Sequence, residues 1–246
     1  LPDQVIPFSV SREDAEKGFK DYVCKKKFVP RAFYNKKQVE SITGVYFPYW
    51  HYNTRLEGKM QGEARNVRVW RTGNTEYTET KYYQVSREGD VKLENLTENA
   101  LGKANQELIC GVMPYDFKDV KKFQLGFLSG FLAEKRDIEK KQIEKKVQQE
   151  ARESAEKLMR EQINGYSSVS VKNADFRALK EKWSYTLLPV WTITYKAKNG
   201  KIYYFSMNGQ TGKVYGELPT DYKKISLVSG IVSLVTLVIL LLGGLA

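Results

Sequence analysis

Few residues of this chain have the types and spacing that catalysis or metal binding requires. His51 is the only histidine, lies in an aromatic run from Tyr49 to Tyr52, and has no partner to orient it as in a catalytic triad. Cys24 and Cys110 are far apart and form no Cys-x-x-Cys pair, which excludes a four-thiolate metal site within this segment. We interpret Cys24 as a half-buried helix residue and Cys110 as a packed one. No catalytic, cofactor-binding or metal-ligating residue is therefore predicted here.

Nucleotide and nucleic-acid chemistry are also poorly represented. Gly209 to Lys213 reads G-Q-T-G-K, which has the wrong spacing for a phosphate-binding loop and lacks its hydroxyl, so we interpret it as a β-turn. The formal net charge of +11 is spread thinly along the 246 residues. Nucleic-acid sites concentrate Lys and Arg on one face, whereas the dense clusters here are only Lys25 to Lys27 and the lysines of one helical segment. Nucleic acid is therefore not an expected partner of this segment.

The C-terminal segment has a different composition from the rest. Residues 225–246 carry no charge, and about 20 apolar residues suffice to cross a hydrocarbon core of about 30 Å. We interpret 225–246 as a transmembrane helix in contact with the lipid bilayer of the cell membrane. Lys223 and Lys224 precede it, and this bias places the soluble part on the cytoplasmic side. Because Leu1 is not a start methionine and Ala246 ends within the apolar run, both ends are expected to be cut ends of a longer protein.

The first part of the chain predicts a helix followed by strands. Ser11 and Asp14 form a capping-box variant ahead of apolar residues at helical spacing, which predicts a helix over 12–27. A helical turn is expected over 38–42. A β-rich run follows over 44–60, and Pro48 predicts that this strand lies at a sheet edge or is bulged there.

Residues 62–95 alternate between apolar and polar types, which predicts antiparallel strands with one wet face. Turn residues over 72–75 and 88–90 predict two reversals of the chain. A helix is expected over 99–110.

A long amphipathic helix is predicted over 137–164, closed by Gly165. Its apolar stripe consists of Ile143, Val147, Ala151, Ala155, Leu158, Met159 and Ile163. The helix either packs on the sheet with a solvated charged back or docks a coiled-coil partner. The candidate partner or lipid contacts are four helix lysines and the two juxtamembrane ones: Lys140, Lys141, Lys145, Lys146, Lys223 and Lys224.

Strand patterns return after the helix. Residues 166–171, 187–196 and 201–208 alternate, Asn199-Gly200 predicts a hairpin, and 209–212 predicts a second turn. The predicted fold class is α+β, with antiparallel sheet segments around the long helix. Two proline-bearing, Trp-containing strands hint at duplication. The expected domains are a cytoplasm-facing α+β domain over 1–222 and the transmembrane helix over 225–246.

Four segments carry a resemblance to a known family. They are 6–33 (IPFSVSREDAEKGFKDYVCKKKFVPRAF), 44–53 (GVYFPYWHYN), 130–141 (GFLAEKRDIEKK) and 188–219 (LPVWTITYKAKNGKIYYFSMNGQTGKVYGELP). With the membrane span, the chain resembles bacterial membrane proteins that begin with a TFIIB-type zinc ribbon, the YdjG-like family. Residues 201–216 are also similar to the C-terminal hairpin of PepSY domains, which serve as regulatory or inhibitory modules.

The resemblance implies a function but no catalytic residue. It implies zinc in a ribbon upstream of Leu1 and a role in recruiting a PspA-like phage-shock protein to the membrane. We therefore expect a membrane-anchored, non-enzymatic adaptor in bacterial envelope stress or homeostasis. One alternative is a PepSY-like ligand-sensing module with a pocket formed by Tyr46 to Tyr52 and Trp191. Another is a nucleic-acid-binding protein completed by the upstream ribbon.

Overall fold

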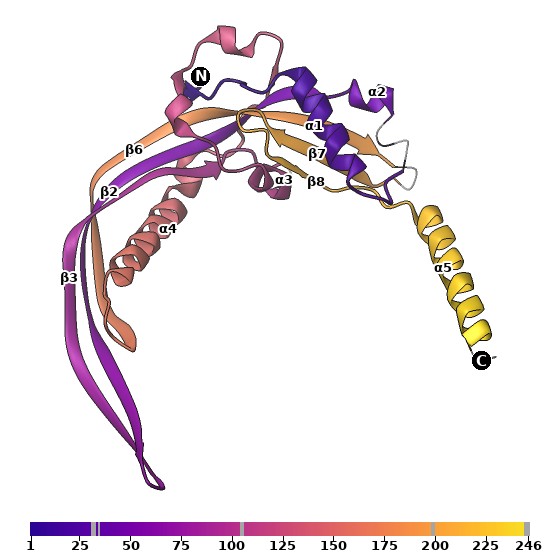
Figure 1. Ribbon diagram of the computed structural model, residues 1–246. Helices are drawn as coiled ribbons and strands as arrows, with labels where there is room; N and C mark the ends of the chain where they lie inside the picture. The colour runs from indigo at the N-terminus through magenta and orange to yellow at the C-terminus, as the bar shows by residue number, and fades with distance from the viewer. Residues whose placement is uncertain (31–32, 34, 104–105, 198–199, 244–246) are drawn as a thin grey trace. The chain divides into compact units, whose positions relative to one another are not determined.

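The computed structural model describes residues 1–246 apart from 31–32, 34, 104–105, 198–199 and 244–246. It is a mixed α/β structure with a large sheet (Figure 1), as the sequence predicts in outline. The helices are α1 (Arg12–Cys24), α2 (Lys36–Val39), α3 (Gln106–Gly111), α4 (Lys140–Glu161) and α5 (Tyr222–Gly243), with 3₁₀ turns η2 (Phe117–Asp119) and η3 (Leu125–Leu128). The strands are β1 (Gln4–Val5), β2 (Thr43–Thr72), β3 (Thr75–Asn99), β4 (Lys121–Lys122), β5 (Leu132–Ala133), β6 (Ser168–Lys196), β7 (Ile202–Asn208) and β8 (Val214–Gly216).

The chain divides into two compact units. Unit 1 comprises residues 1–3, 49–100 and 136–186, and unit 2 comprises residues 4–48, 101–135 and 187–246. The long strands β2 and β6 contribute residues to both. Within the described residues the sheet has eight strands, in the order β3-β2-β6-β1-β4, with β5 paired to β2 and with β7 and β8 following β6.

In unit 1, β2 and β3 form one long antiparallel hairpin. Thr72 pairs with Thr75 at its tip, so the predicted reversal at 72–75 is confirmed. The predicted turn at 88–90 is wrong, because Gly89 lies inside β3 opposite Gly58. The flanking charges are satisfied across the ladder: Lys59 pairs with Glu88 at 2.9 Å, and Arg55 pairs with Asp90. Gly89 therefore continues β3 and does not end it.

Pro48 predicts an edge strand or a bulge, and the first of these alternatives is wrong for β2. In the sheet order, β2 lies between β3 and β6. Proline is tolerated there because β5 pairs with β2 at Val45 and Tyr46, and the β3 ladder begins only at Tyr49. On that side of β2, Pro48 thus falls in the interval between two partner strands, and neither the β5 ladder nor the β3 ladder includes it.

Helix α4 covers one face of the unit 1 sheet. Its residues Ile143, Val147, Ala151, Ala155 and Met159 are buried. A Cβ atom built on Gly58 would lie 2.7 Å from the Met159 Sδ, so this side chain packs directly on the strand backbone. Three predictions about the helix are corrected here. It starts at Lys140 and not at 137. It ends at Glu161 with Gln162 as its C-cap, so Gly165 is not the C′ residue. Leu158 is 43% exposed and not part of the stripe.

In unit 2, α1 packs on one face of β6 and β7. Its Ser11 N-cap accepts a hydrogen bond from the Asp14 N–H at 3.1 Å, which confirms the predicted cap. The helix ends at Cys24, earlier than the predicted residue 27. The core that it shares with the sheet consists of Ala15, Phe19, Val23, Val29, Phe33, Val39, Ile42, Trp191, Ile193, Phe205 and Met207.

The remaining turns and helices of unit 2 follow the sequence in part. Strands β6 and β7 pair from Lys196–Ile202 onward, so a hairpin forms as predicted, although Asn199 itself lies outside the described residues. The predicted helix over 99–110 is wrong at its start, because residue 99 ends β3 and α3 begins at Gln106. Residues 104–105 of that prediction also lie outside the described residues.

Helix α5 is long and apolar enough to cross a membrane, over Tyr222–Leu242, and none of its most apolar stretch is buried within the structure. Lys223 and Lys224, predicted to precede the span, lie in its first turn. A core helix would bury a stripe of side chains. The exposure of α5 therefore fits a helix that is surrounded by lipid and not by water.

Candidate functional site

The most unusual surface of unit 1 is the far end of its hairpin. Strand β6 begins beside Arg65, where the Ser167 N–H donates to the Arg65 carbonyl at 2.9 Å. Beyond that point β2 and β3 continue as a pair, from Val67–Thr80 to Thr72–Thr75. We call residues 67–80 the ribbon. Figure 1 shows it continuing past the start of β6 and past α4.

One face of the ribbon carries an exposed aromatic pair. Trp70 and Tyr77 are cross-strand partners, their rings stack at 5.6 Å, and they are 42% and 46% exposed. The guanidinium of Arg68 lies 5.7 Å from the Trp70 ring centroid. Trp, Tyr and Arg are the residue types enriched at the energetic centres of protein interfaces.

This face continues the face that α4 covers. Side chains two apart on a strand point to the same side, so Trp70 shares a face with Leu56, Met60 and Ala64. Those three are buried. The sheet face therefore changes from covered to uncovered along one strand, and the sequence analysis missed this. A sequence signal for the aromatic pair was present, because residues 70 and 77 lie equally far from the turn at 72–75 and therefore face each other across the hairpin.

The four α4 lysines that were predicted as contacts are divided between two environments. Lys140 pairs with Glu144 at 3.1 Å and lies 5.5 Å from the Trp183 ring. Lys146 donates to Glu98 at 2.6 Å, and this hydrogen bond raises its pKa. Lys141 and Lys145 are exposed, four residues apart, and within the described residues neither forms an ion pair. Of the four predicted contacts on α4, these two remain available to a partner.

The two juxtamembrane lysines also differ. The Lys224 ammonium donates to the Val29 carbonyl at 2.9 Å and lies 3.7 Å from Asp221, so it fastens the start of α5 to the loop after α1. Lys223 is exposed and forms no ion pair with any residue that the structure describes. Lys224 is thus a structural contact, while Lys223 faces outward.

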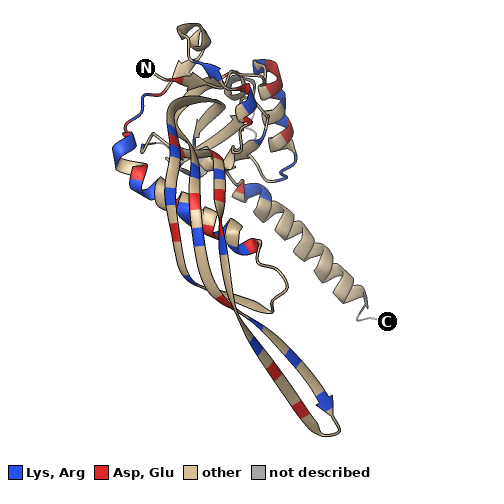
Figure 2. Ribbon diagram, turned by 90° about the vertical axis from the view of Figure 1, so that its left-hand side faces the viewer, with Lys and Arg blue, Asp and Glu red and all other residues tan. Residues whose placement is uncertain are grey.

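Charge on the unit 1 sheet is mixed in sign. Figure 2 shows Lys and Arg alternating with Asp and Glu along β2, β3 and β6. Many pair across strands: Lys59–Glu88, Lys172–Glu63 and Arg177–Glu57, at 2.9, 3.4 and 2.8 Å. A nucleic-acid site instead favours a continuous basic stripe.

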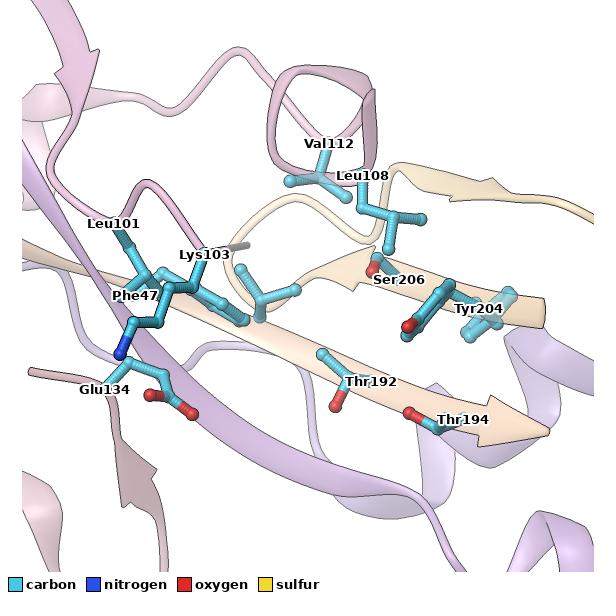
Figure 3. A pocket seen from close by; sticks show the side chains of 12 residues that line it. Phe47, Leu101, Lys103, Leu108, Val112, Glu134, Thr192, Thr194, Tyr204 and Ser206 are labelled. Carbon is cyan, nitrogen blue, oxygen red and sulfur yellow. The ribbon is translucent and has the colours of Figure 1, made fainter. Parts of the chain in front are cut away.

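Unit 2 contains a cavity of about 300 Å³ between α3 and the second face of β6 and β7 (Figure 3). Strand alternation explains it. Trp191 and Ile193 point into the α1 core, so Val190, Thr192 and Thr194 point to the opposite face. Thr192 pairs with Ser206, and Thr194 pairs with Tyr204, which adds two more hydroxyls to the wall.

The chemistry of this cavity suits a small, mainly apolar molecule. Phe47, Leu101, Leu108 and Val112 form apolar walls, and hydroxyls lie on the strand side. Lys103 and Glu134 lie at one end of the cavity in Figure 3. The predicted pocket from Tyr46 to Tyr52 and Trp191 is not formed as such, because of these residues only Phe47 lines this cavity. Tyr46 instead packs in the interior, where its ring centroid lies 5.1 Å from that of Phe8.

The sequence candidates for chemistry lie apart. His51 is buried in β2, where Asn95 Oδ1 is 3.1 Å from its Nε2, and burial lowers its pKa. Cys24 and Cys110 are exposed, contrary to the half-buried and packed placements expected. Within the described residues, no group of three or more His, Cys, Asp or Glu side chains could hold a metal ion.

These features describe a mixed α/β protein with a large sheet, a projecting ribbon and one helix apolar enough to span a membrane. The chain is similar to the uncharacterized protein YdjG of Bacillus subtilis (strain 168), with 29% identity over 248 residues. The match covers 99% of this chain and 72% of YdjG. No protein-family model matches the chain, and no solved structure matches it. The name YdjG states neither an activity nor a metal site. The comparison therefore does not test the zinc ribbon expected upstream of Leu1, which stays a prediction.

Proposed function

We propose that this chain is a membrane-anchored, non-enzymatic adaptor on the cytoplasmic side of the cell membrane. In this proposal α5 crosses the bilayer, and unit 1 presents the ribbon to a protein partner. A PspA-like protein is the partner class that the family resemblance implies, in bacterial envelope stress or homeostasis. A zinc ribbon upstream of Leu1 would complete the protein.

The observation that supports the proposal best is the uncovered aromatic face of the ribbon. An isolated two-stranded hairpin is marginally stable in water, and exposed apolar patches commonly mark interaction sites. Here Trp70 and Tyr77 lie where no third strand and no described helix covers them. A partner that packs on this face would bury the aromatic pair and support the ribbon.

The test is a pull-down of the tagged full-length chain from its native membranes in mild detergent, followed by mass spectrometry. The variant Trp70→Ala/Tyr77→Ala removes the aromatic pair. The matched control is Val69→Ala/Tyr82→Ala, because these residues are 55% and 71% exposed but lie on the opposite face of the hairpin. The proposal predicts an envelope protein that co-purifies with the wild type and the control and is lost with the first variant.

A further variant tests the α4 surface separately. Lys141→Glu/Lys145→Glu reverses the two predicted α4 contacts that form no ion pair with a described residue. Loss of the partner in this variant alone would move the binding site from the ribbon to α4. Equal capture by all variants, or a partner that appears equally with an untagged control, would contradict the adaptor proposal.

The cavity beneath α3 favours ligand sensing as a second candidate function. Its volume of about 300 Å³ is at the lower end for small-molecule sites, and its walls are largely apolar. Native mass spectrometry of the purified chain would test it. Sensing predicts a bound small molecule that is lost in Thr192→Phe, which fills the cavity, and retained in the surface variant Lys141→Glu/Lys145→Glu.

A further inference from the structure

A second surface, in unit 2, lies beside the start of α5. It is a groove of about 600 Å³ between the loop that follows α1 and the segment that leads into α5. One side is formed by residues 25–29, and the other by Gly216, Leu218, Pro219, Thr220 and Ile225. Ile225 is the first residue of the uncharged run. The groove therefore opens where the chain changes from a soluble to an apolar segment.

Hydrogen bonds fix the two sides of the groove to each other. The Asp221 N–H donates to the Phe28 carbonyl at 2.7 Å, and the Lys224 ammonium donates to the Val29 carbonyl at 2.9 Å. Val29 is itself buried in the α1 core. The position of the groove relative to the first turn of α5 is thus set by the packing of unit 2.

The groove has a basic rim and an apolar wall. Lys25, Lys26 and Lys27 are exposed, and within the described residues none of them forms an ion pair. The described lining residues include no Asp or Glu. The wall is apolar and continues toward α5, through Tyr22, Phe28, Leu218, Pro219 and Ile225.

Ordinary helix chemistry explains only part of this cluster. Lys25 is the C-cap of α1, where a cation is favoured by the helix dipole. Lys26 and Lys27 lie beyond the cap, and nothing in the packing of unit 2 requires their charges. Figure 2 shows basic residues at the start of α5 and no charge along the rest of it. Positive charge therefore gathers at the level where a bilayer surface would meet the protein.

We propose that this groove binds the headgroup of an anionic phospholipid. The phosphate would lie on the ammonium groups of Lys25 to Lys27, and the acyl chains would follow the apolar wall along α5. The inference rests on the proposed membrane span but not on the protein partner. It concerns a lipid taken from the surrounding leaflet, because the apolar wall leads directly into the span.

The experiment is native mass spectrometry of the full chain in detergent, titrated with phosphatidylglycerol or phosphatidylcholine. We expect the first phosphatidylglycerol to bind at least about tenfold more tightly than phosphatidylcholine, given the attraction that each lysine contributes near anionic lipid. Lys25→Glu/Lys26→Glu/Lys27→Glu should abolish this preference. Lys25→Arg/Lys26→Arg/Lys27→Arg should retain it, since the charge is kept.

The matched control is Lys141→Glu/Lys145→Glu/Lys157→Glu, which changes the net charge equally on exposed lysines of α4. The lipid preference should persist there. If control and groove variants lose it equally, or if the wild type shows no preference, the proposed groove is overturned. Circular dichroism checks that each variant folds. Extraction of the wild type from membranes by alkaline carbonate would instead refute the membrane span, and partner capture is measured separately.

Discussion

The sharpest structural prediction concerns two glycines of the same hairpin. Gly62 in β2 and Gly89 in β3 both lie inside long strands of unit 1. A Cβ atom built on Gly62 would lie 2.4 Å from the Ser170 carbonyl oxygen, a backbone atom of β6. A Cβ atom built on Gly89 would have nothing within 4 Å. Alanine should therefore act oppositely at the two positions.

The expected magnitudes follow from these contacts. Glycine in a strand interior costs about 0.5–1 kcal/mol relative to alanine, so Gly89→Ala should raise the free energy of unfolding by about that amount. At Gly62 the same gain is opposed by overpacking, which costs typically about 1–3 kcal/mol, because the backbone of β6 must move. Gly62→Ala should therefore lower the free energy of unfolding by about 1–2 kcal/mol.

The assay is urea unfolding of the full chain in detergent, followed by tryptophan fluorescence. Trp50 and Trp183 lie in unit 1 and report on it. The two midpoints should shift in opposite directions from the wild type, with unchanged slopes. A stabilising effect of Gly62→Ala, or equal effects of the two substitutions, would refute the placement of β6 against this part of β2.

Three further predictions test unit 1 by the same unfolding assay. Met159→Ala should lower the free energy of unfolding by about 2–4 kcal/mol, because the Met159 side chain is only 5% exposed where it packs on the sheet. Leu158→Ala, at 43% exposure, should change it by about 0.5 kcal/mol or less. Similar costs for the two substitutions would contradict the assignment of the buried face of α4. The Tyr52 hydroxyl donates to Glu181 at 2.5 Å, and burial together with this bond raises the pKa of Tyr52 to about 12. Tyr52→Phe should therefore lower the free energy of unfolding by about 1 kcal/mol at pH 8. Because the pKa of Tyr52 in the folded state exceeds its unfolded value of about 10, the stability difference between wild type and variant should shrink as pH rises from 10 to 12. A stability difference that is independent of pH would contradict this. Burial lowers the pKa of His51. The contribution of neutral His51 to stability is therefore present above the unfolded pKa of about 6.5 and is lost as the pH falls below that value. The free energy of unfolding of His51→Gln should therefore fall less between about pH 6.5 and 5 than that of the wild type.

Much of the local structure could be predicted from the sequence where one physical signal dominated. The Ser11 cap, the reversal at 72–75 and the apolar run of α5 each depend on a few neighbouring residues, and each is found in the structure. These signals are local because capping bonds, tight turns and membrane partition need no information from distant parts of the chain.

Strand length could not be predicted, because tertiary context decides it. Pro48 and Gly89 are usual strand breakers, yet β2 and β3 continue through them. The reason lies in partners distant in sequence: the interval between β5 and β3 accommodates the proline, and cross-strand ion pairs flank the glycine. Leu158 shows the same limit, since helical spacing assigned it to the buried stripe beside Met159 but packing left it exposed.

The candidate surfaces were predictable only in part. The lysines of α4 and α5 were identified by type, but the sequence did not show that Lys146 and Lys224 are engaged in contacts within the fold. The ribbon was missed because its aromatic residues resemble ordinary strand residues in the sequence. Only the structure shows that β6 does not extend alongside them. The groove at Lys25 to Lys27 required the fold of unit 2 to bring it beside α5.

The central claim is that this chain holds a protein partner at a membrane through the ribbon. The most direct measurement is flotation of liposomes that carry the full chain, mixed with a purified PspA-like protein. The account predicts that this protein floats with liposomes carrying the wild type or Val69→Ala/Tyr82→Ala and stays in the dense fraction with Trp70→Ala/Tyr77→Ala. Failure to float with the wild type, or equal flotation with every variant, would contradict it.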